Sequence, residues 1–147
     1  MNKYALLAVL PFLLFGMWIL ISMMLGYLSG WYALQDRFPC NDEPALQRRR
    51  FQSAGLGKGK AWNPWGNVRY ARCLVIDICV SGLRVKFWGL CGFRYRPFLV
   101  PWDKISCEEG RILFMPFYRL SLGDPELSVL TIQPRTFDWI KASGLMR

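Results

Sequence analysis

Few residues in this 147-residue sequence could perform catalysis, and the absence of histidine narrows the possibilities first. Without imidazole there is no Ser-His or Cys-His nucleophile pair, and most zinc sites lose a usual ligand. The neighbouring acids Glu108 and Glu109 are the best candidates for an acid–base pair, but Gly110 follows them, which is typical of a solvated hairpin turn. We therefore predict that the protein is not an enzyme and has no catalytic residue, metal or cofactor.

The segment "GLGKGK", residues 55–60, has the composition of a phosphate-binding loop but not its spacing. Such a loop needs G-x-x-x-x-G-K-[ST] between a strand and a helix. We interpret the segment as basic linker. Near a bilayer, basic residues of this linker would be attracted to an anionic leaflet, and five of them form the predicted membrane contact: Arg48, Arg49, Arg50, Lys58 and Lys60. Ordinary topology-setting charge, without docking, is the alternative.

A second candidate contact is "WGLCGFRYRPF", residues 88–98, where aromatic residues alternate with arginines in a predicted loop. Exposed aromatic side chains beside arginine are typical of interfaces with proteins or membranes. Phe93 and Tyr95 could instead cap one end of the sheet, and Cys91 could be a reactive thiol near Arg94. The predicted partner-contact residues are Trp88, Phe93, Arg94, Tyr95 and Arg96.

Cysteine usage predicts a reducing compartment. The five cysteines cannot all pair within the chain, and no C-x-x-C motif occurs. Cys73 and Cys79 are predicted on one strand about 20 Å apart, too far to bridge each other. We expect free, mostly buried thiols at Cys40, Cys73, Cys79, Cys91 and Cys107.

The elements that would position these residues begin with residues 4–28, which contain no charged side chain. As a helix this stretch would be about 37 Å long, enough to cross a hydrocarbon core of about 30 Å. Tyr4 at one end and Tyr27, Trp31 and Tyr32 at the other suit the interfacial aromatic belts. A cleaved signal peptide is the alternative, but its apolar region is shorter and a small-residue cleavage site follows it. We predict a transmembrane helix.

The net charge of +9 lies almost entirely after this stretch, because Lys3 is the single basic residue before it. The positive-inside rule, applied to Arg37 and the arginines at 48–50, places the carboxy-terminal part in the cytoplasm, at the inner membrane. The cationic part suits the anionic leaflet of the lipid bilayer as a neighbour, and we expect no nucleic acid partner.

Three parts follow along the chain: a transmembrane helix at 1–29, a juxtamembrane segment and basic linker at 30–67, and a β domain at 68–147. Residues 30–38 are expected to continue the helix beyond the bilayer and stop before Pro39. The linker is expected to be irregular, with a short first strand near residues 50–53.

A hairpin is the clearest signal in the β domain. In "CLVIDICV", residues 73–80, and "LRVKFW", residues 83–88, apolar residues alternate between faces. With Ser81-Gly82 as a two-residue loop, Val80 faces Leu83 and Asp77 faces Lys86. A slip of one residue would mix the faces, so burial excludes it.

Four further segments complete the domain. "PFLVPW", residues 97–102, reads as an edge strand that ends at Pro101, with Trp102 covering the end of the core. "RILFM", "YRLSLG" and "ELSVLTIQ" supply three more strands. Residues 134–144 predict a helix with Pro134 at its first position, Phe137 and Ile140 facing inward, and Gly144 just past its end.

The fold class is therefore mainly β (α+β): an N-terminal transmembrane helix followed by an antiparallel β-barrel or sandwich closed by one C-terminal helix. Strands followed by a helix that carries Trp139 resemble the PH-like and GRAM-like superfold. "VSGLRVKFW" followed by "FRYRPFLVPWDKI" resembles the "GLxL…F…PxxIPWxxI" pattern of small uncharacterised bacterial single-pass membrane proteins with such a domain, and "SGWYALQDRFP" resembles their "GWxxLAxxFP" pattern. The resemblance covers roughly residues 29–140 and implies a PH-like fold. It supplies no catalytic or binding residues.

PH-like modules often bind lipid headgroups or proteins, so the resemblance implies a membrane-anchored interaction module at the cytoplasmic membrane surface, with a protein partner or a homo-oligomer possible. The first hairpin loop lacks the cationic cluster of lipid-binding eukaryotic members. The alternative function is a structural or accessory subunit of a larger membrane complex, whose span would pack on other helices through Gly16, Ser22 and Gly26.

Overall fold

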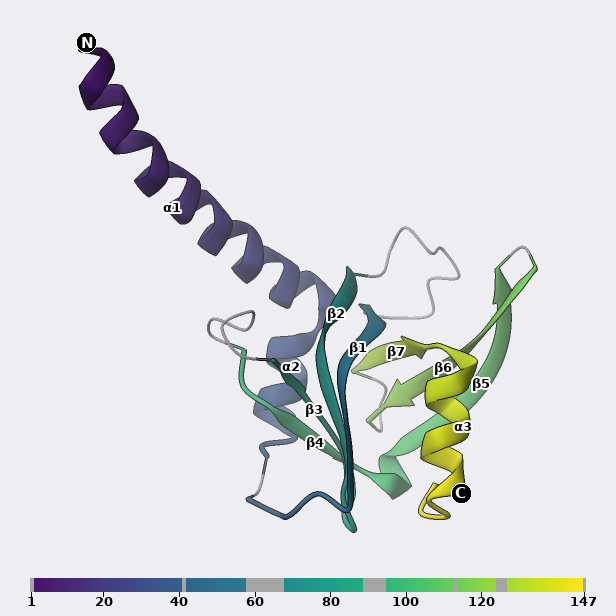
Figure 1. Cartoon of the computed structure of the whole chain (residues 1–147). Coiled ribbons are helices and arrows are strands. Elements are labelled where there is room, and N and C mark those ends of the chain that lie inside the picture. The colour runs from purple at the N-terminus through teal and green to yellow at the C-terminus, as the bar shows by residue number, and fades with distance from the viewer. Residues whose placement is uncertain are drawn as a thin grey trace.

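The computed structural model describes residues 2–40, 42–57, 68–88, 95–112, 114–123 and 127–146 (Figure 1). Its elements in chain order are α1 (Lys3–Ser29), α2 (Trp31–Arg37), β1 (Gln47–Gly57), β2 (Val68–Ile78), β3 (Gly82–Phe87), β4 (Phe98–Pro101), the 3₁₀ turn η2 (Trp102–Lys104), β5 (Ile105–Ile112), β6 (Met115–Leu122), β7 (Ser128–Ile132) and α3 (Pro134–Ala142).

Helix α1 projects from the domain as a long rod and continues through Pro11 without ending there (Figure 1). It ends at Gly30, whose φ of 82° lies in the left-handed region that glycine adopts at little cost. Helix α2 therefore starts at Trp31 in a new direction, and the expectation of one continuous helix over 30–38 is wrong. The predicted stop before Pro39 is confirmed, because α2 ends at Arg37.

The seven strands form one curled antiparallel sheet in the order β4-β3-β2-β1-β7-β6-β5 (Figure 1). Strand β1 is central and pairs with both β2 and β7. It is 11 residues long, so the predicted short strand near residues 50–53 exists but extends further at both ends than expected. The apolar N-terminal helix, the mainly β domain and the single C-terminal helix agree with the predicted fold class.

The predicted hairpin forms between β2 and β3, but with a different register. Ile78 pairs with Leu83 and Asp77 with Arg84, because residues 79–81 connect the strands and Gly82 belongs to β3. The shift is two residues, so every side chain keeps its predicted face except Val80, which leaves the core and is exposed. The predicted pairing of Asp77 with Lys86 is replaced by one with Arg84.

The two edges of the sheet also test the predictions. Strand β4 is an edge strand that ends at Pro101, as predicted, and Trp102 packs against the core. At the other edge, Glu108 and Glu109 lie within strand β5 and not in a turn. Gly110 lies opposite Phe117, whose ring would be 2.7 Å from a Cβ at that position, so this glycine makes room for an aromatic ring.

One hydrophobic core fills the curled sheet and receives both short helices. Trp31 and Leu34 enter it from α2, and Phe137 and Ile140 enter it from α3. The inward orientation predicted for the α3 pair is confirmed. Trp31 is fully buried, so its predicted place in an interfacial aromatic belt is wrong.

Candidate functional site

The end of α1 is fastened to the sheet through Ser29. The Tyr70 hydroxyl donates to Ser29 Oγ at 2.9 Å, and Ser29 Oγ donates to the Gly26 carbonyl oxygen at 3.2 Å. The Ser128 hydroxyl lies 2.8 Å from the Ser29 carbonyl oxygen and 2.9 Å from that of Gly57. Ser29 and Ser128 are fully buried, so these bonds form away from water and tie the helix to β1, β2 and β7.

Tyr95 makes a second connection further back along α1. Its hydroxyl donates to the Ser22 carbonyl oxygen, and its ring packs over Gly26. A Cβ at Gly26 would lie 2.9 Å from the Tyr95 ring and 2.8 Å from that of Tyr32, so only glycine permits this approach. Burial raises the pKa of Tyr95, so its hydroxyl keeps the proton that it donates. Tyr95 therefore lies beside the apolar part of α1.

Trp31 is the centre of the aromatic cluster beneath this contact. Its indole nitrogen donates to the Arg96 carbonyl oxygen at 3.0 Å. Its ring centroid lies 4.7 Å from those of Phe87 and Phe98 and 5.5 Å from that of Tyr95. We call this region the junction; it is formed by Gly26, Ser29, Trp31, Tyr70, Phe87, Tyr95 and Phe98.

A buried charge cluster lies on the other face of β2 and β3. Asp77 is fully buried and accepts hydrogen bonds from Arg48 at 2.7 Å and from Arg84 at 2.9 Å. The Lys86 ammonium is 3.8 Å away. Burial alone would raise the pKa of Asp77, but the bonds and charges of the two arginines outweigh it and hold that pKa below its usual value.

The segment between α2 and β1 packs over this cluster. The Arg84 guanidinium donates to the Glu43 carbonyl oxygen at 2.7 Å, and the Ser81 amide donates to the Glu43 carboxylate at 3.2 Å. The Leu46 amide donates to the Ile78 carbonyl oxygen at 2.7 Å. Asp77 and Arg84 thus join three parts of the chain and are enclosed by them, which indicates a structural role.

The structure gives the three predicted membrane-contact arginines individual environments. Arg48 is bound to Asp77, Arg49 lies over the Trp139 ring at 4.8 Å, and Arg50 is exposed. They lie seven to nine residues before Gly57, the end of β1 that reaches the junction, which is about 25 Å of strand. Figure 1 shows β1 beginning at the end of the sheet far from α1. Their role as leaflet contacts stays a prediction, and Lys58 and Lys60 lie outside the described residues.

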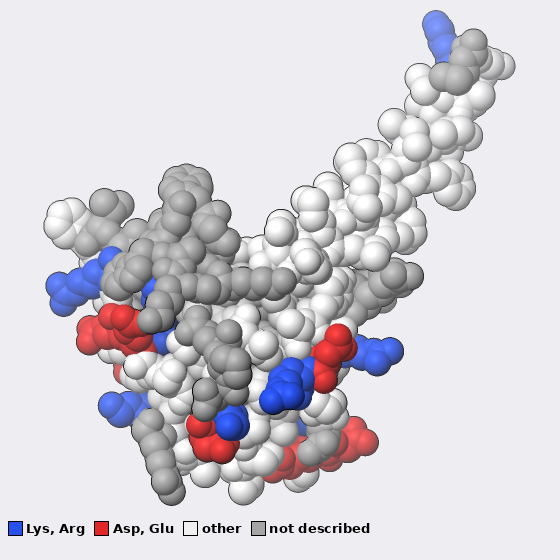
Figure 2. All heavy atoms as spheres, turned by 180° about the vertical axis from the view of Figure 1, so that it is seen from behind, with Lys and Arg blue, Asp and Glu red and all other residues white. Residues whose placement is uncertain are grey.

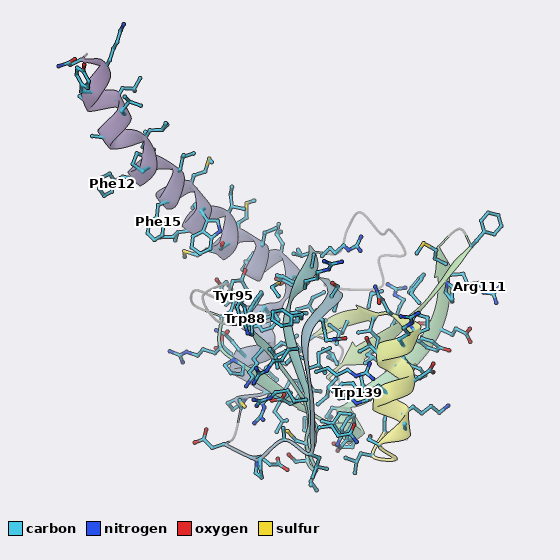
Figure 3. The ribbon with its side chains drawn as sticks, in the orientation of Figure 1. Phe12, Phe15, Trp88, Tyr95, Arg111 and Trp139 are labelled. Atoms are coloured by element: carbon cyan, nitrogen blue, oxygen red, sulfur yellow. The ribbon has the colours of Figure 1, made fainter. Side chains whose placement is uncertain are left out.

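The predicted partner-contact loop is only partly described, since Phe93, Arg94 and Cys91 lie outside the described residues. Trp88 is 45% exposed and Arg96 is also exposed, so both are available to a partner. Tyr95 packs inside the junction, which agrees with the alternative that it caps an end of the sheet. Figure 3 shows Trp88 and Tyr95 close to the end of α1.

The structure gives Asp77 and Phe51 environments that the sequence analysis did not predict. Asp77 was expected in a cross-strand pair, yet its position in the middle of an apolar strand already signalled a buried charge that needs more than one partner. Phe51 received no role, although an aromatic residue directly after three arginines is unusual in a solvated linker. It is 55% exposed, and its ring lies 5.2 Å from that of Trp88.

The thiols offer little chemistry. Among the described cysteines none is in a disulfide, in line with the prediction, but Cys79 is the single buried one: Cys40 and Cys73 are intermediate and Cys107 is exposed. Within the same residues no group of three His, Cys, Asp or Glu side chains is placed to hold a metal ion.

Comparisons with protein-family models, curated proteins and solved structures found no significant match for this chain.

Proposed function

We propose that this protein is a single-pass membrane protein whose PH-like domain is an interaction module held at the cytoplasmic membrane surface. The observation that carries the proposal is the surface of α1. It is the one helix among the described residues with the length and composition to cross a bilayer, and none of its most apolar window is buried in the domain. Figure 2 shows the rod without charged side chains beyond Lys3 near its tip.

An apolar surface on all sides of a helix is unstable in water, so α1 needs lipid or another protein around it. Tyr4 and Tyr27, at its two ends, are exposed and suit the two interfaces of a bilayer. Within the proposal, lipid covers α1 and the charged domain stays in water.

Within the proposal, the junction also fixes the orientation of the domain relative to α1. Because Ser29 bonds Tyr70 and Ser128 while Tyr95 bonds Ser22, the sheet cannot swing freely about the end of the helix. A domain fixed in this way always presents the same rim to the lipid surface, which suits recognition at the membrane. We place the contact at Trp88 and Arg96, beside α1, more than at the distant Arg48–Arg50 segment.

The PH-like assignment is supported by the curled antiparallel sheet and by the one helix that follows the last strand. Binding is favoured over catalysis because the chain has no histidine and because the buried carboxylate of Asp77 is already paired with Arg48 and Arg84. The partner within this proposal is a lipid headgroup or a protein at the same surface.

Cys107 provides a test of both span and side. It is exposed on β5, far from the span, so a membrane-impermeant maleimide should label it only after cells are permeabilised. Cys107→Ser is the control for labelling of the other thiols. Alkaline extraction should leave the chain in the membrane pellet, whereas Leu14→Arg, which costs about 2.5–3.5 kcal/mol at mid-bilayer, should reduce integration. Labelling in intact cells would overturn the cytoplasmic assignment, and full alkaline extraction would overturn the span.

The alternative function, a subunit whose span packs on other helices, finds one favourable feature. A Cβ at Gly16 would meet nothing within 4 Å, so this part of α1 is open to a neighbouring helix. Ser22 and Gly26, the other members of the predicted helix-packing motif, contact Tyr95 of the same chain. A stoichiometric partner after gentle detergent extraction, lost in Gly16→Leu, would favour the subunit.

A further inference from the structure

An exposed aromatic pair lies on the outer side of the sheet. Phe51 and Trp88 are 55% and 45% exposed, and their ring centroids are 5.2 Å apart. They come from the middle of β1 and the residue after β3, so folding brings them together. Two neighbouring aromatic rings exposed to water form an apolar patch, and such patches are typical of interaction sites.

The backbone presents Phe51 in a conformation that bulky residues avoid. Phe51 has a φ of 56°, and Arg72 on the adjacent strand has a φ of 55°. The β1–β2 register shifts on both sides of Gln52, and the Arg72 amide donates to Ser53 Oγ at 2.9 Å. Such left-handed residues cost about 1–3 kcal/mol each. Bending the sheet explains the irregularity, but it does not explain a phenylalanine where glycine or asparagine would fit more easily.

Trp88 directly follows a residue of the junction. The Trp88 amide donates to the Cys73 carbonyl oxygen at 2.8 Å, which fixes Trp88 at the end of the β3 ladder. Phe87, the preceding residue, has its ring 4.5 Å from that of Tyr95. Tyr95 in turn bonds Ser22 of α1, within the apolar stretch. Figure 3 shows Trp88 beside the base of α1 in agreement with this chain of contacts.

An exposed arginine lies near the pair, because Arg72 on β2 donates its amide to Ser53 Oγ, two residues after Phe51. Aromatic rings beside cations have the composition of a membrane interface, where the rings enter the headgroup level and the cations reach phosphate. We propose that the Phe51–Trp88 pair is a second membrane contact, inserted at the interface of the bilayer that α1 crosses. This inference rests on the proposed function, since it requires α1 to span.

The contact would set the rotation of the domain about α1. One helix fixes where the domain is tethered, whereas a second contact at its side selects which rim faces the lipid. The bilayer is preferred to a protein partner because Trp88 directly follows Phe87 of the junction, where Tyr95 bonds α1, the helix that needs lipid.

The test uses the full chain in vesicles made with phospholipids brominated on the acyl chain near the headgroup. The difference in tryptophan fluorescence between the wild type and Trp88→Phe isolates Trp88, and the difference with Trp18→Phe isolates a residue within α1. We expect bromine to quench both. If Trp18 is quenched and Trp88 is not, the inference fails and the span stands. If neither is quenched, the proposed span fails as well.

Phe51→Gly separates binding from folding. Glycine removes the ring and relieves the left-handed strain, so the domain should be at least as stable in detergent as the wild type. Quenching of Trp88 by the brominated lipid should nevertheless fall about twofold, because half of the interfacial pair is gone. Phe114→Ala, at a side chain that is 98% exposed elsewhere, is the matched control and should leave quenching unchanged. Unchanged quenching in Phe51→Gly would overturn the inference.

Discussion

Replacing the buried Asp77 with the isosteric asparagine should strongly lower the free energy of unfolding of the domain. The side chain is fully buried, and its removal leaves the Arg84 guanidinium, only 8% exposed, without a counter-charge. Breaking a buried ion pair by neutralising one partner costs about 3–5 kcal/mol. Since the asparagine oxygen can still accept one hydrogen bond, we expect a loss near about 3 kcal/mol.

Urea denaturation of the full chain in detergent micelles measures this loss. With a slope of about 2 kcal/mol/M, the midpoint should fall by about 1.5 M. Arg48→Gln is the comparison: its side chain is 39% exposed and Arg84 still pairs with Asp77, so its loss should cost less than the loss of the carboxylate. An Asp77→Asn midpoint within error of the wild type would refute the reasoning that the cluster is a buried structural centre.

The same variant makes a prediction about pH. The pKa of Asp77 is lowered below the ordinary 3.8, so its stabilising contribution is fully present above that value. It is lost as pH falls through the lower pKa of the folded state, where the wild-type carboxylate also becomes neutral. The difference in unfolding free energy between wild type and Asp77→Asn should therefore be constant from pH 7 to 5 and shrink below about 3.8. A difference that grew on acidification would contradict the direction of the shift.

Three further substitutions test packing at single positions. Gly82→Ala should lower the urea midpoint strongly, because the new Cβ would lie 2.2 Å from the Val100 carbonyl oxygen, a backbone atom that cannot move aside. Gly26→Ala should loosen the junction, seen as faster amide exchange in α2, whereas Gly16→Ala should change nothing there. Ser128→Ala removes the hydroxyl shared between two buried carbonyl oxygens and should cost about 1–3 kcal/mol in the same urea assay.

The elements that were predictable are those whose signal is local. Alternation identified β2 and β3, and Pro134 with Gly144 marked both ends of α3, since Gly144 has a φ of 74° just past the helix. Pro97 and Pro101 identified an edge strand because neither can donate to a ladder. The proline and glycine signals act through the backbone of the residue that carries them, and alternation acts through the two faces of one strand.

The errors arose where a distant contact decided the outcome. The hairpin register shifted by two because side-chain alternation has a period of two and cannot distinguish such registers. What decides between them is Gly82, which packs against β4 and belongs to β3. Similarly, Trp31 looked like an interfacial aromatic, but the turn at Gly30 redirects it into the core, where Phe87 and Phe98 surround it.

The sequence indicated which residue types could form contacts, but not which of these residues lie together in the fold. The sequence analysis proposed arginines and aromatic residues as contacts, yet sequence could not pair Phe51 with Trp88, because the pair depends on an irregularity shared by two strands. Nor could it separate Arg48, which Asp77 holds, from Arg50, which is exposed. Arg48 lies opposite Asp77 in the β1–β2 register, whereas Arg50 falls within the register shift between Arg49 and Gln52.

Two polar networks connect the N-terminal segments to the sheet, each at a different point. The Asp77 cluster joins the segment after α2 to the sheet, while the junction joins α1 to the same sheet through Ser29 and Tyr95. The chain from the apolar helix to β1 is thus fixed at both ends. The domain and α1 should therefore move together, because hydrogen bonds at Ser29 and Tyr95 hold them in one relative orientation. The orientation of the exposed Trp88 side chain relative to α1 is therefore built into the fold.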